Sequence, residues 1–348
     1  MPGLQIGIDL GTTSILIYVR GKGIVLHEAS VAALDSATGD VLAVGNRVAS
    51  MVGRSPDSLR IVHPMRDGVI SDFTVIQAML GYYIRRLCGN RVFKPSVMIC
   101  MPASVTGLER GAILELAIAA GAGRACLVEE PLAAALGAGM NVAYRGGQMI
   151  VDIGGGTTDV AILTMGTMAL SRSAKVAGNA LSEAVQRHLR RERNVLIGDP
   201  TAEEIKRKVG CARLRSAELA VYVKGQSYIT HLPAKIEITS SECYLAMRER
   251  LEAMVRVMQR TLEETPPEMA GDIAEQGVVL TGGGALLRDL DVMLHERTGL
   301  KIRTAKNPVS CVAAGLGIMM EHQNVLEDNG YFYRTEDDIG EYTRSRNL

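Results

Sequence analysis

Short apolar runs alternate with stretches of helical periodicity along most of the chain. Runs with the length of a buried strand occur within residues 4–35, at 97–101, within 149–163 and at 277–280. Between them, residues 72–88 place their large apolar side chains at helical spacing, with polar residues on the other face. Strands and helices that alternate in this way predict an α/β protein.

Capping patterns and turn residues place further elements. Thr-x-x-Glu, which caps a helix N-terminus reciprocally, predicts helix starts at Thr106, Thr201 and Thr239. The pair Pro266-Pro267 predicts the end of the third of these helices. Further helices are expected at 180–193, 286–298 and 308–321, and further strands within 218–239 and at 301–304.

Two apolar strands in residues 149–163 flank a turn of three glycines and two threonines. Glycine has no Cβ, so phosphate oxygens can approach the exposed N–H groups of Gly154, Gly155 and Gly156. Thr157 and Thr158 add hydroxyl donors. Asp152, at the end of the first strand, could hold a hydrated Mg²⁺ beside the phosphates.

The same design occurs near the N-terminus. Asp9 corresponds to Asp152 and is followed by Gly11, Thr12, Thr13 and Ser14, then by a second strand. One Gly-rich hairpin is weak evidence of a ligand, because hairpins without ligands also use glycine. Two matching hairpins, each led by an aspartate, favour a phosphate clamp over two ordinary turns.

A third glycine run follows the apolar strand 277–280. Gly282, Gly283, Gly284 and Ala285 would let a nucleotide base or ribose lie against bare backbone. The alternative is a plain connection from a strand to a helix.

These loops, together with Glu129-Glu130-Pro131, resemble the actin, Hsp70 and sugar-kinase ATPase superfamily. Within it, the chain is similar to the MreB family, the bacterial actins that determine rod shape. The resemblance extends from the N-terminus to about residue 320. It rests on the segments 7–12, 21–26, 64–70, 128–131, 151–158 and 280–288.

The resemblance implies an actin-like fold with two similar lobes and a nucleotide cleft between them. We expect a first lobe over 1–145 with an inserted subdomain at about 33–65. A second lobe would cover 146–324, with an inserted subdomain at about 179–239. Residues 325–348 are charged and are expected to form a flexible C-terminal tail.

The resemblance also assigns roles within an ATP–Mg²⁺ site. Asp9 and Asp152 would hold Mg²⁺ through water, and Glu130 would position the attacking water with help from Thr157. Glu203 and Lys206 become candidates for ribose or adenine contacts, although most charges on such a helix face solvent. Glu130 could instead favour only the helix N-terminus.

Composition narrows the functional classes. Lys plus Arg and Asp plus Glu are 38 each, so no basic footprint for nucleic acid is present, and the low net charge favours association between copies. The six cysteines are far apart without a CxxC pair, which predicts buried free thiols in a reducing cytosol. No signal peptide or apolar run long enough to span a bilayer is found.

Residues 90–95 place Val92 and Phe93 between two cations, Arg91 and Lys94. One interpretation is a surface loop whose Phe93 folds back onto the core. The other is a tip that inserts Val92 and Phe93 into a membrane interface while the cations meet lipid phosphates. Members of the MreB family bind membranes through such a loop or through an N-terminal helix. Only eight residues precede Asp9, which favours the loop.

The resemblance therefore implies a slowly hydrolysing ATPase that polymerises into filaments on the inner face of the cytoplasmic membrane. Its partners would be further copies of itself and the membrane proteins of cell-wall elongation, so that it organises peptidoglycan synthesis and cell shape. A sugar or acid kinase would need an acceptor pocket with a base aspartate, and an Hsp70-like ATPase would need a peptide-binding domain. Two departures from the family pattern stand out, Thr12-Thr13-Ser14 for Thr-Ala-Asn and Asp159 for glutamate.

Overall fold

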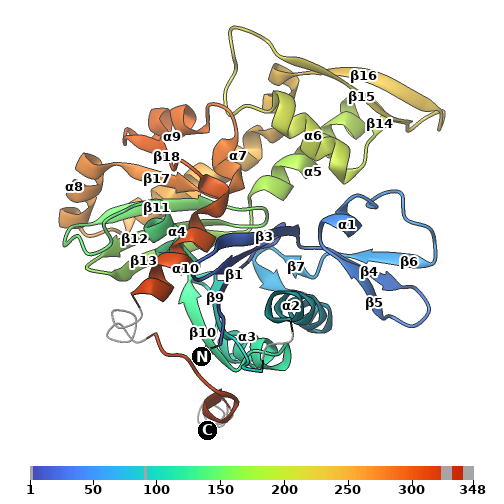
Figure 1. Cartoon of the computed structure of the whole chain (residues 1–348). Helices are drawn as coiled ribbons and strands as arrows, with labels where there is room; N and C mark the ends of the chain where they lie inside the picture. The colour runs from blue at the N-terminus through green and yellow to red at the C-terminus, as the bar shows by residue number, and fades with distance from the viewer. Residues whose placement is uncertain (1–2, 90–91, 323–330, 340–348) are drawn as a thin grey trace. The chain divides into compact units, whose positions relative to one another are not determined.

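The computed structural model describes residues 3–89, 92–322 and 331–339. The chain forms two compact α/β units (Figure 1). The first comprises Met1–Arg145, Leu163–Ser171 and Val309–Leu348, and the second comprises Gly146–Ile162 and Arg172–Pro308.

The first unit is built on a five-stranded sheet of order β10-β9-β1-β2-β3. β1 pairs antiparallel with β2 and parallel with β9, and β9 pairs parallel with β10. The central strands are almost continuously apolar, as expected when helices cover a sheet. The elements are β1 (Gln5–Leu10), β2 (Ser14–Val19), β3 (Gly23–Ala29), β9 (Ser96–Met101), β10 (Arg124–Glu129), α2 (Phe73–Cys88), α3 (Gly107–Ala119), α4 (Glu130–Gly137) and α10 (Cys311–Glu321).

Helix α10 comes from the far end of the chain, yet it packs against α4 and β1 of the first unit. The packing is close because both helices present glycine. A Cβ on Gly315 would lie 1.8 Å from the carbonyl oxygen of Ala133, and one on Gly137 would lie 1.8 Å from that of Cys311. The sequence predicted a second lobe that ran on to residue 324. Sequence order alone cannot indicate this return of the chain.

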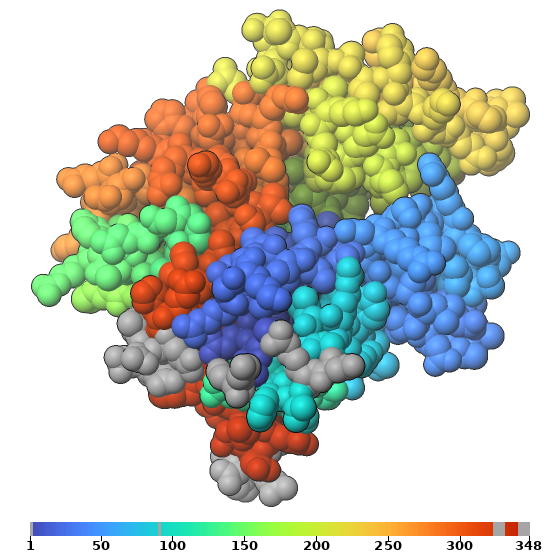
Figure 2. Space-filling model, in the orientation of Figure 1, coloured from blue at the N-terminus to red at the C-terminus, as the bar shows by residue number. Residues whose placement is uncertain are grey.

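A small sheet of order β5-β4-β6 occupies the region expected to hold the first insertion. It has a core of its own around Val31, Ala33 and Val48. Its atoms form the light-blue group in Figure 2. The elements are β4 (Ala32–Asp35), β5 (Val41–Val44), α1 (Asn46–Ala49) and β6 (Leu59–Val62), followed by the hairpin β7 (Met65–Arg66) and β8 (Val69–Ile70).

The second unit is built on the other five-stranded sheet, of order β13-β12-β11-β17-β18. β11 pairs parallel with β17, which in turn pairs parallel with β18. The elements are β11 (Gln148–Ile153), β12 (Thr158–Thr164), β13 (Thr167–Ala174), β17 (Val278–Thr281), β18 (Ile302–Thr304), α5 (Gly178–Glu192), α7 (Ser240–Glu263), α8 (Pro267–Gln276), α9 (Leu290–Thr298) and the 3₁₀ turns η1 (Gly283–Leu286) and η2 (Pro308–Ser310).

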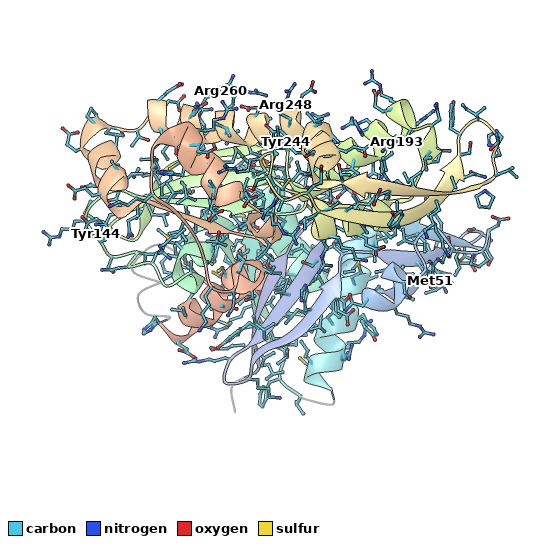
Figure 3. All side chains as sticks on the ribbon, turned by 90° about the horizontal axis from the view of Figure 1, so that it is seen from above. Met51, Tyr144, Arg193, Tyr244, Arg248 and Arg260 are labelled. Atoms are coloured by element: carbon cyan, nitrogen blue, oxygen red, sulfur yellow. The ribbon has the colours of Figure 1, made fainter. Side chains whose placement is uncertain are left out.

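A three-stranded sheet of order β14-β15-β16 accompanies α6 (Asp199–Val209) in the second unit. Its strands are β14 (Val195–Leu196), β15 (Ala220–Ser227) and β16 (Pro233–Thr239). Helix α7 buries an apolar stripe that includes Met247, Leu251 and Met254. Arg248 and Arg260 are exposed and point away from its buried side (Figure 3).

The predicted helix starts have mixed outcomes. The Thr106–Glu109 capping box is present in full, and Thr239 caps α7 by accepting a hydrogen bond from the N–H of Glu242. The capping box predicted at Thr201 is wrong, because the N-cap of α6 is Gly198 and the helix begins at Asp199 with Pro200 in its first turn. The start predicted at 286 is also wrong, since η1 occupies Gly283–Leu286 and α9 begins at Leu290. Helix α8 was not anticipated.

The end of the described chain departs from the flexible tail expected over 325–348. Residues 331–339 pack on the first unit, and Ile339 is buried in its core. The remainder of that predicted tail, 325–330 and 340–348, lies outside the described residues. Within the residues that the structure describes, no helix has both the length and the apolar character needed to cross a bilayer. All six cysteines are free, and all but Cys88 are buried.

Candidate nucleotide site

The first aspartate-led loop lies at the end of β1 in the first unit. Asp9 is buried near the last residue of this strand. The loop closes tightly, because the N–H of Gly11 donates to the carbonyl oxygen of Ser14 over 3.1 Å. A Cβ on Gly11 would lie 2.8 Å from that oxygen, so the turn requires glycine. Thr13 is exposed, and Thr12 and Ser14 are partly exposed.

Thr12 is held by a hairpin that the sequence did not link to this loop. Its Oγ1 accepts a hydrogen bond of 3.0 Å from the N–H of Gly68. Asp67 and Gly68 both have positive φ, 47° and 76°, as in the primed turns that join short antiparallel strands. The Asp-Gly pair between β7 and β8 is a sequence signal for that turn, but its contact with Thr12 is tertiary.

Glu130 is the first residue of α4, directly after the last residue of β10. It is partly exposed, and Pro131 follows it in the first turn. The neighbouring Glu129 has a different environment, since its carboxylate binds the guanidinium of Arg110 and the hydroxyl of Tyr331. The two glutamates therefore differ in the structure: Glu129 accepts hydrogen bonds from two distant side chains, and Glu130 begins the helix.

The second aspartate-led loop lies at the end of β11 in the second unit. Asp152 is 3 % exposed and pairs in register with Thr281 of β17. The hydroxyl of Thr281 donates to Asp152 Oδ1 over 2.7 Å. This bond fixes one carboxylate oxygen, and a buried aspartate is a hard oxygen ligand of the kind that suits Mg²⁺. The carboxylate at the end of β11 thus fits that ion.

The turn of the second loop is fastened to the start of α5. The N–H groups of Gly178 and Asn179 donate to the carbonyl oxygens of Gly154 and Gly155, over 3.1 and 2.8 Å. The N–H of Gly154 donates to the carbonyl oxygen of Thr157 over 2.9 Å. Because these carbonyls are occupied, the loop presents its remaining N–H groups in a fixed arrangement.

Thr158, the second threonine of this loop, has a structural partner. The hydroxyl of Thr158 donates to the carbonyl oxygen of Val176 over 2.6 Å, and Thr158 is 1 % exposed. It therefore stabilises the loop and is not presented for direct ligand contact, contrary to the direct role predicted for it. Thr157 and Gly156 are also buried in the described structure.

Glu203 and Lys206 of α6 form an ion pair of 2.5 Å. Lys206 also donates to the carbonyl oxygen of Gly178 over 2.8 Å, and Glu203 accepts from the hydroxyl of Ser182 over 2.9 Å. Through Gly178, the ammonium group of Lys206 is tied to the residues that hold the second loop. The alternative interpretation was that the charges on this helix face solvent. It is wrong for Lys206, whose side chain is 12 % exposed.

The glycines of the third loop are not equivalent. Gly282 has a φ of 78°, and a Cβ there would lie 2.3 Å from the carbonyl oxygen of Ile153. A Cβ on Gly284 would lie 2.2 Å from the Ile153 side chain, whereas one on Gly283 would meet no atom within 4 Å. Gly282 and Gly284 are thus explained by packing against the end of β11. Gly283 alone has open space beside it, and Ala285 is buried.

Asp159, the residue that departs from the family pattern, is 3 % exposed within β12. Burial raises the pKa of its carboxyl group, while the hydroxyls of Ser173 and Thr157 act in the opposite direction. A carboxyl in this environment favours its neutral form more than an exposed aspartate does. Its position two residues after Thr157 places it at the base of the second loop.

Val92 and Phe93 lie in the connection from α2 to β9. They are 91 % and 59 % exposed to solvent. Phe93 does not fold back onto the core, so that interpretation is wrong. Arg91, the first of the two flanking cations, lies outside the described residues.

In the second unit, the three predicted site segments form one connected network. Asp152 and Thr281 join the second loop to β17, Gly178 joins it to α5 and α6, and the backbone of Ala212 joins the end of α6 to Arg288 beyond the third loop. Strand-end carboxylate, glycine-rich turn and hydroxyls are the groups that bind a magnesium–phosphate ligand. The first unit carries the matching loop around Asp9.

Comparison with known proteins agrees with this arrangement. Residues 3–328 match the sequence profile of the MreB/Mbl protein family. The chain is 46 % identical to the cell shape-determining protein Mbl of Bacillus cereus over 321 residues, 91 % of this chain and 96 % of that protein. It is 43 % identical to the cell shape-determining protein MreB of Escherichia coli K12 over 323 residues, 91 % of this chain and 93 % of that protein.

Solved structures give the same result for the fold. MreB5 of Spiroplasma citri bound to ADP is 35 % identical and superposes with a TM-score of 0.90, over 94 % of this chain and 99 % of that one. The same protein bound to AMPPNP gives an equal TM-score. A MamK double helical filament is 21 % identical, with a TM-score of 0.77 over 91 % of this chain and 98 % of that one, which bears on the fold alone. The predicted actin-like α/β class is confirmed.

Proposed function

The chain belongs to the MreB/Mbl family, and from this membership we propose that it is an actin-like cytoskeletal ATPase that binds ATP and Mg²⁺, forms filaments and determines cell shape. Relatives over 40 % identical across most of their length are named cell shape-determining proteins. A sugar or acid kinase, or an Hsp70-like ATPase, is not favoured, because the match to this family covers 3–328.

One observation carries the nucleotide part of the proposal. In the second unit the Thr281 hydroxyl fixes Asp152 while the amides of α5 fix the glycine turn that follows it. The similar S. citri protein has been solved with ADP and with AMPPNP. A buried carboxylate beside a preformed turn supports magnesium–nucleotide binding without a large reorganisation of the loop.

The proposed mechanism divides the work between side chains and backbone. The N–H groups of the two glycine loops and the hydroxyls of Thr12, Thr13, Ser14 and Thr157 would bind the phosphates. Asp9 and Asp152 would hold Mg²⁺ through water, and that ion supplies charge neutralisation at the phosphates when bound. Glu130 would orient the attacking water. Glu203, Lys206, Gly283 and Ala285 would border the nucleoside.

Hydrolysis is expected to be slow and to govern assembly. Phosphoryl transfer requires mainly positioning and charge neutralisation, and these groups can supply both. Head-to-tail contacts that do not close into a ring produce filaments. The formal net charge of zero gives little repulsion between copies.

Membrane association would use the exposed side chains of Val92 and Phe93 on the inner face of the cytoplasmic membrane. Cell-wall elongation proteins in the membrane would be further partners. Changing both residues to serine should abolish pelleting with anionic liposomes and leave ATP hydrolysis unchanged. Undiminished pelleting would contradict this assignment.

The decisive experiment is sedimentation and electron microscopy of the purified protein with ATP, ADP or AMPPNP, with and without lipid. ATP-dependent filaments and slow phosphate release are expected, and Asp152→Asn should lose both. GTP in parallel tests base preference. A protein that sediments identically with and without nucleotide and releases no phosphate from ATP would refute the proposal. Transfer of phosphate from ATP to a small-molecule acceptor would favour a kinase.

A further inference from the structure

Residues Tyr331–Ile339, called the tail segment below, extend the sheet of the first unit at its edge. β10 is the last strand in the order β10-β9-β1-β2-β3. Arg334 pairs antiparallel with Ala125 of β10, with N–H to carbonyl hydrogen bonds of 2.7 and 2.8 Å in the two directions. The tail segment thus occupies backbone groups that an edge strand would otherwise leave open.

Side chains anchor the tail segment on both sides of this bridge. The guanidinium of Arg124 lies 4.8 Å from the ring centre of Tyr333, within the range of a cation–π contact. Thr335 and Asp338 cap a helical turn at 336–339 by exchanging hydrogen bonds. Ile339 is 2 % exposed and belongs to the apolar core of the first unit. Figure 1 shows the tail segment as the short red piece beside the C label.

The contact closest to the proposed chemistry is made by Tyr331. Its hydroxyl donates to Glu129 Oε2 over 2.6 Å, and Arg110 donates to Glu129 Oε1 over 3.1 Å. Both carboxylate oxygens of Glu129 are therefore held, and its side chain is 15 % exposed. Burial, together with the bond to Glu129, raises the pKa of Tyr331, so its hydroxyl remains a donor at physiological pH.

Glu129 ends β10 and is the N-cap residue of α4, so it stands directly before Glu130. A side chain held from both sides limits the movement of the strand end and of the first helical turn. If Tyr331 were lost, the Glu129 carboxylate would keep its hydrogen bond from Arg110 and would have a wider range of conformations.

The tail segment lies beyond the residues that the MreB/Mbl profile matches, since that match ends at 328. The chain's relatives are matched over almost their full length by 91 % of this chain. The tail segment is therefore an addition to the shared fold that contacts the residue next to the proposed catalytic one.

We propose that Tyr331 is a positioning residue for ATP hydrolysis: with Arg110 it fixes Glu129 and thereby orients the start of α4 and Glu130. The proposal rests on the ATPase function proposed above. It makes hydrolysis depend on the docking of the tail segment, so release of that segment would slow the chemical step without removing any group that contacts the nucleotide.

Four full-length or shortened proteins test the proposal: wild type, Tyr331→Phe, Tyr333→Phe and a variant ending at Asp328. Tyr331→Phe removes the hydrogen bond to Glu129 and keeps the ring. Tyr333→Phe is the matched control, because the Tyr333 hydroxyl has no hydrogen-bond partner among the described residues. Steady-state ATP hydrolysis gives kcat and KM, and amide hydrogen exchange over residues 124–137 is measured without nucleotide.

We expect Tyr331→Phe and the shortened variant to lower kcat about three- to tenfold with KM unchanged, as loss of a charge-assisted hydrogen bond suggests. Both should exchange faster at the start of α4, and Tyr333→Phe should match the wild type. The proposal would be overturned if Tyr331→Phe kept the wild-type kcat and the wild-type exchange rate, or if its kcat rose. It would also be overturned if Tyr333→Phe lost as much kcat as Tyr331→Phe. Absence of wild-type ATP hydrolysis would refute the proposed function instead, and the exchange data would still decide whether Tyr331 orders α4.

Discussion

The two aspartate-led loops share a sequence design but are held in different ways. The first is closed by its own Gly11–Ser14 hydrogen bond and supported from outside by Gly68. The second is fastened by the amides of α5, by Thr158 and by the Thr281–Asp152 bond. Within its own unit, the second loop therefore has more of its geometry fixed by neighbours. We infer that the second loop is preformed and that the first adjusts more readily.

The largest effect is expected from Gly282→Ala in the second unit. The new methyl group would lie 2.3 Å from the Ile153 carbonyl oxygen, at a φ of 78° that favours glycine. We expect a loss of about 2–4 kcal/mol in the free energy of unfolding, measured by chemical denaturation.

Gly283→Ala is the control for this experiment, because the added methyl group meets nothing within 4 Å. Its stability should stay close to wild type. If the Gly283 backbone borders the nucleoside, only this variant should weaken ATP binding without unfolding. Equal losses of stability in both variants would contradict the distinction between packing and ligand glycines.

Thr281→Val and Thr12→Val compare the two loops directly. The first change removes the donor to the buried Asp152, so we expect a loss of about 1.5–3 kcal/mol, as for hydrogen bonds to charged groups. The second removes the acceptor for the Gly68 N–H at a partly exposed site and should cost about 0.5–1.5 kcal/mol. Denaturant unfolding of both variants measures the order, and the reverse order would show that the first loop is the more strongly held.

The smallest effect concerns pH. Asp159 of the second loop aligns with Ser14 of the first once the two extra glycines are allowed for. Because burial raises the pKa of Asp159, the folded state retains its proton when the unfolded state has lost it. The contribution of Asp159 to the free energy of unfolding of the wild type is therefore complete below about pH 4. It declines as the pH rises toward the raised pKa.

Asp159→Asn cannot ionise, so it should be more stable than the wild type near neutral pH, and the gap should shrink toward pH 4. Thermal unfolding at several pH values measures this gap. Ser14→Ala serves as the control and should show the same pH dependence as the wild type. A constant gap between Asp159→Asn and wild type at every pH would show that Asp159 does not titrate in this range.

The sequence predicted those features that depend on local patterns. The Asp-Gly-Thr repeats, the buried strands beside them and the Thr106 capping box are set by nearest-neighbour geometry and periodicity, and the structure contains each of them. The cap of α6 lies before the predicted Thr201, because Pro200 suits a first helical turn as well as Thr201 suits a cap.

Other features depend on contacts between distant residues. The Gly68 bond to Thr12 joins residues 56 positions apart, and the Tyr331 bond to Glu129 joins residues 202 apart. The hydrophobic periodicity of the sequence does not indicate such contacts. The third glycine loop is an intermediate case. The sequence predicted either a contact with a base or ribose or a plain connection from a strand to a helix, and only the position of Ile153 shows that Gly282 and Gly284 are required for packing.

The placement of α10 beneath the first sheet has a consequence for synthesis of the chain. Gly7 of β1 lies against Leu316, since a Cβ on that glycine would be 2.9 Å from the Leu316 Cβ. Strand β1 therefore cannot bury its α10-facing side until more than 300 further residues have been translated. Domains that are contiguous in sequence fold in order from the N-terminus. Here the first unit is completed only when α10 has been made, so the side of β1 near Gly7 stays uncovered by α10 until then.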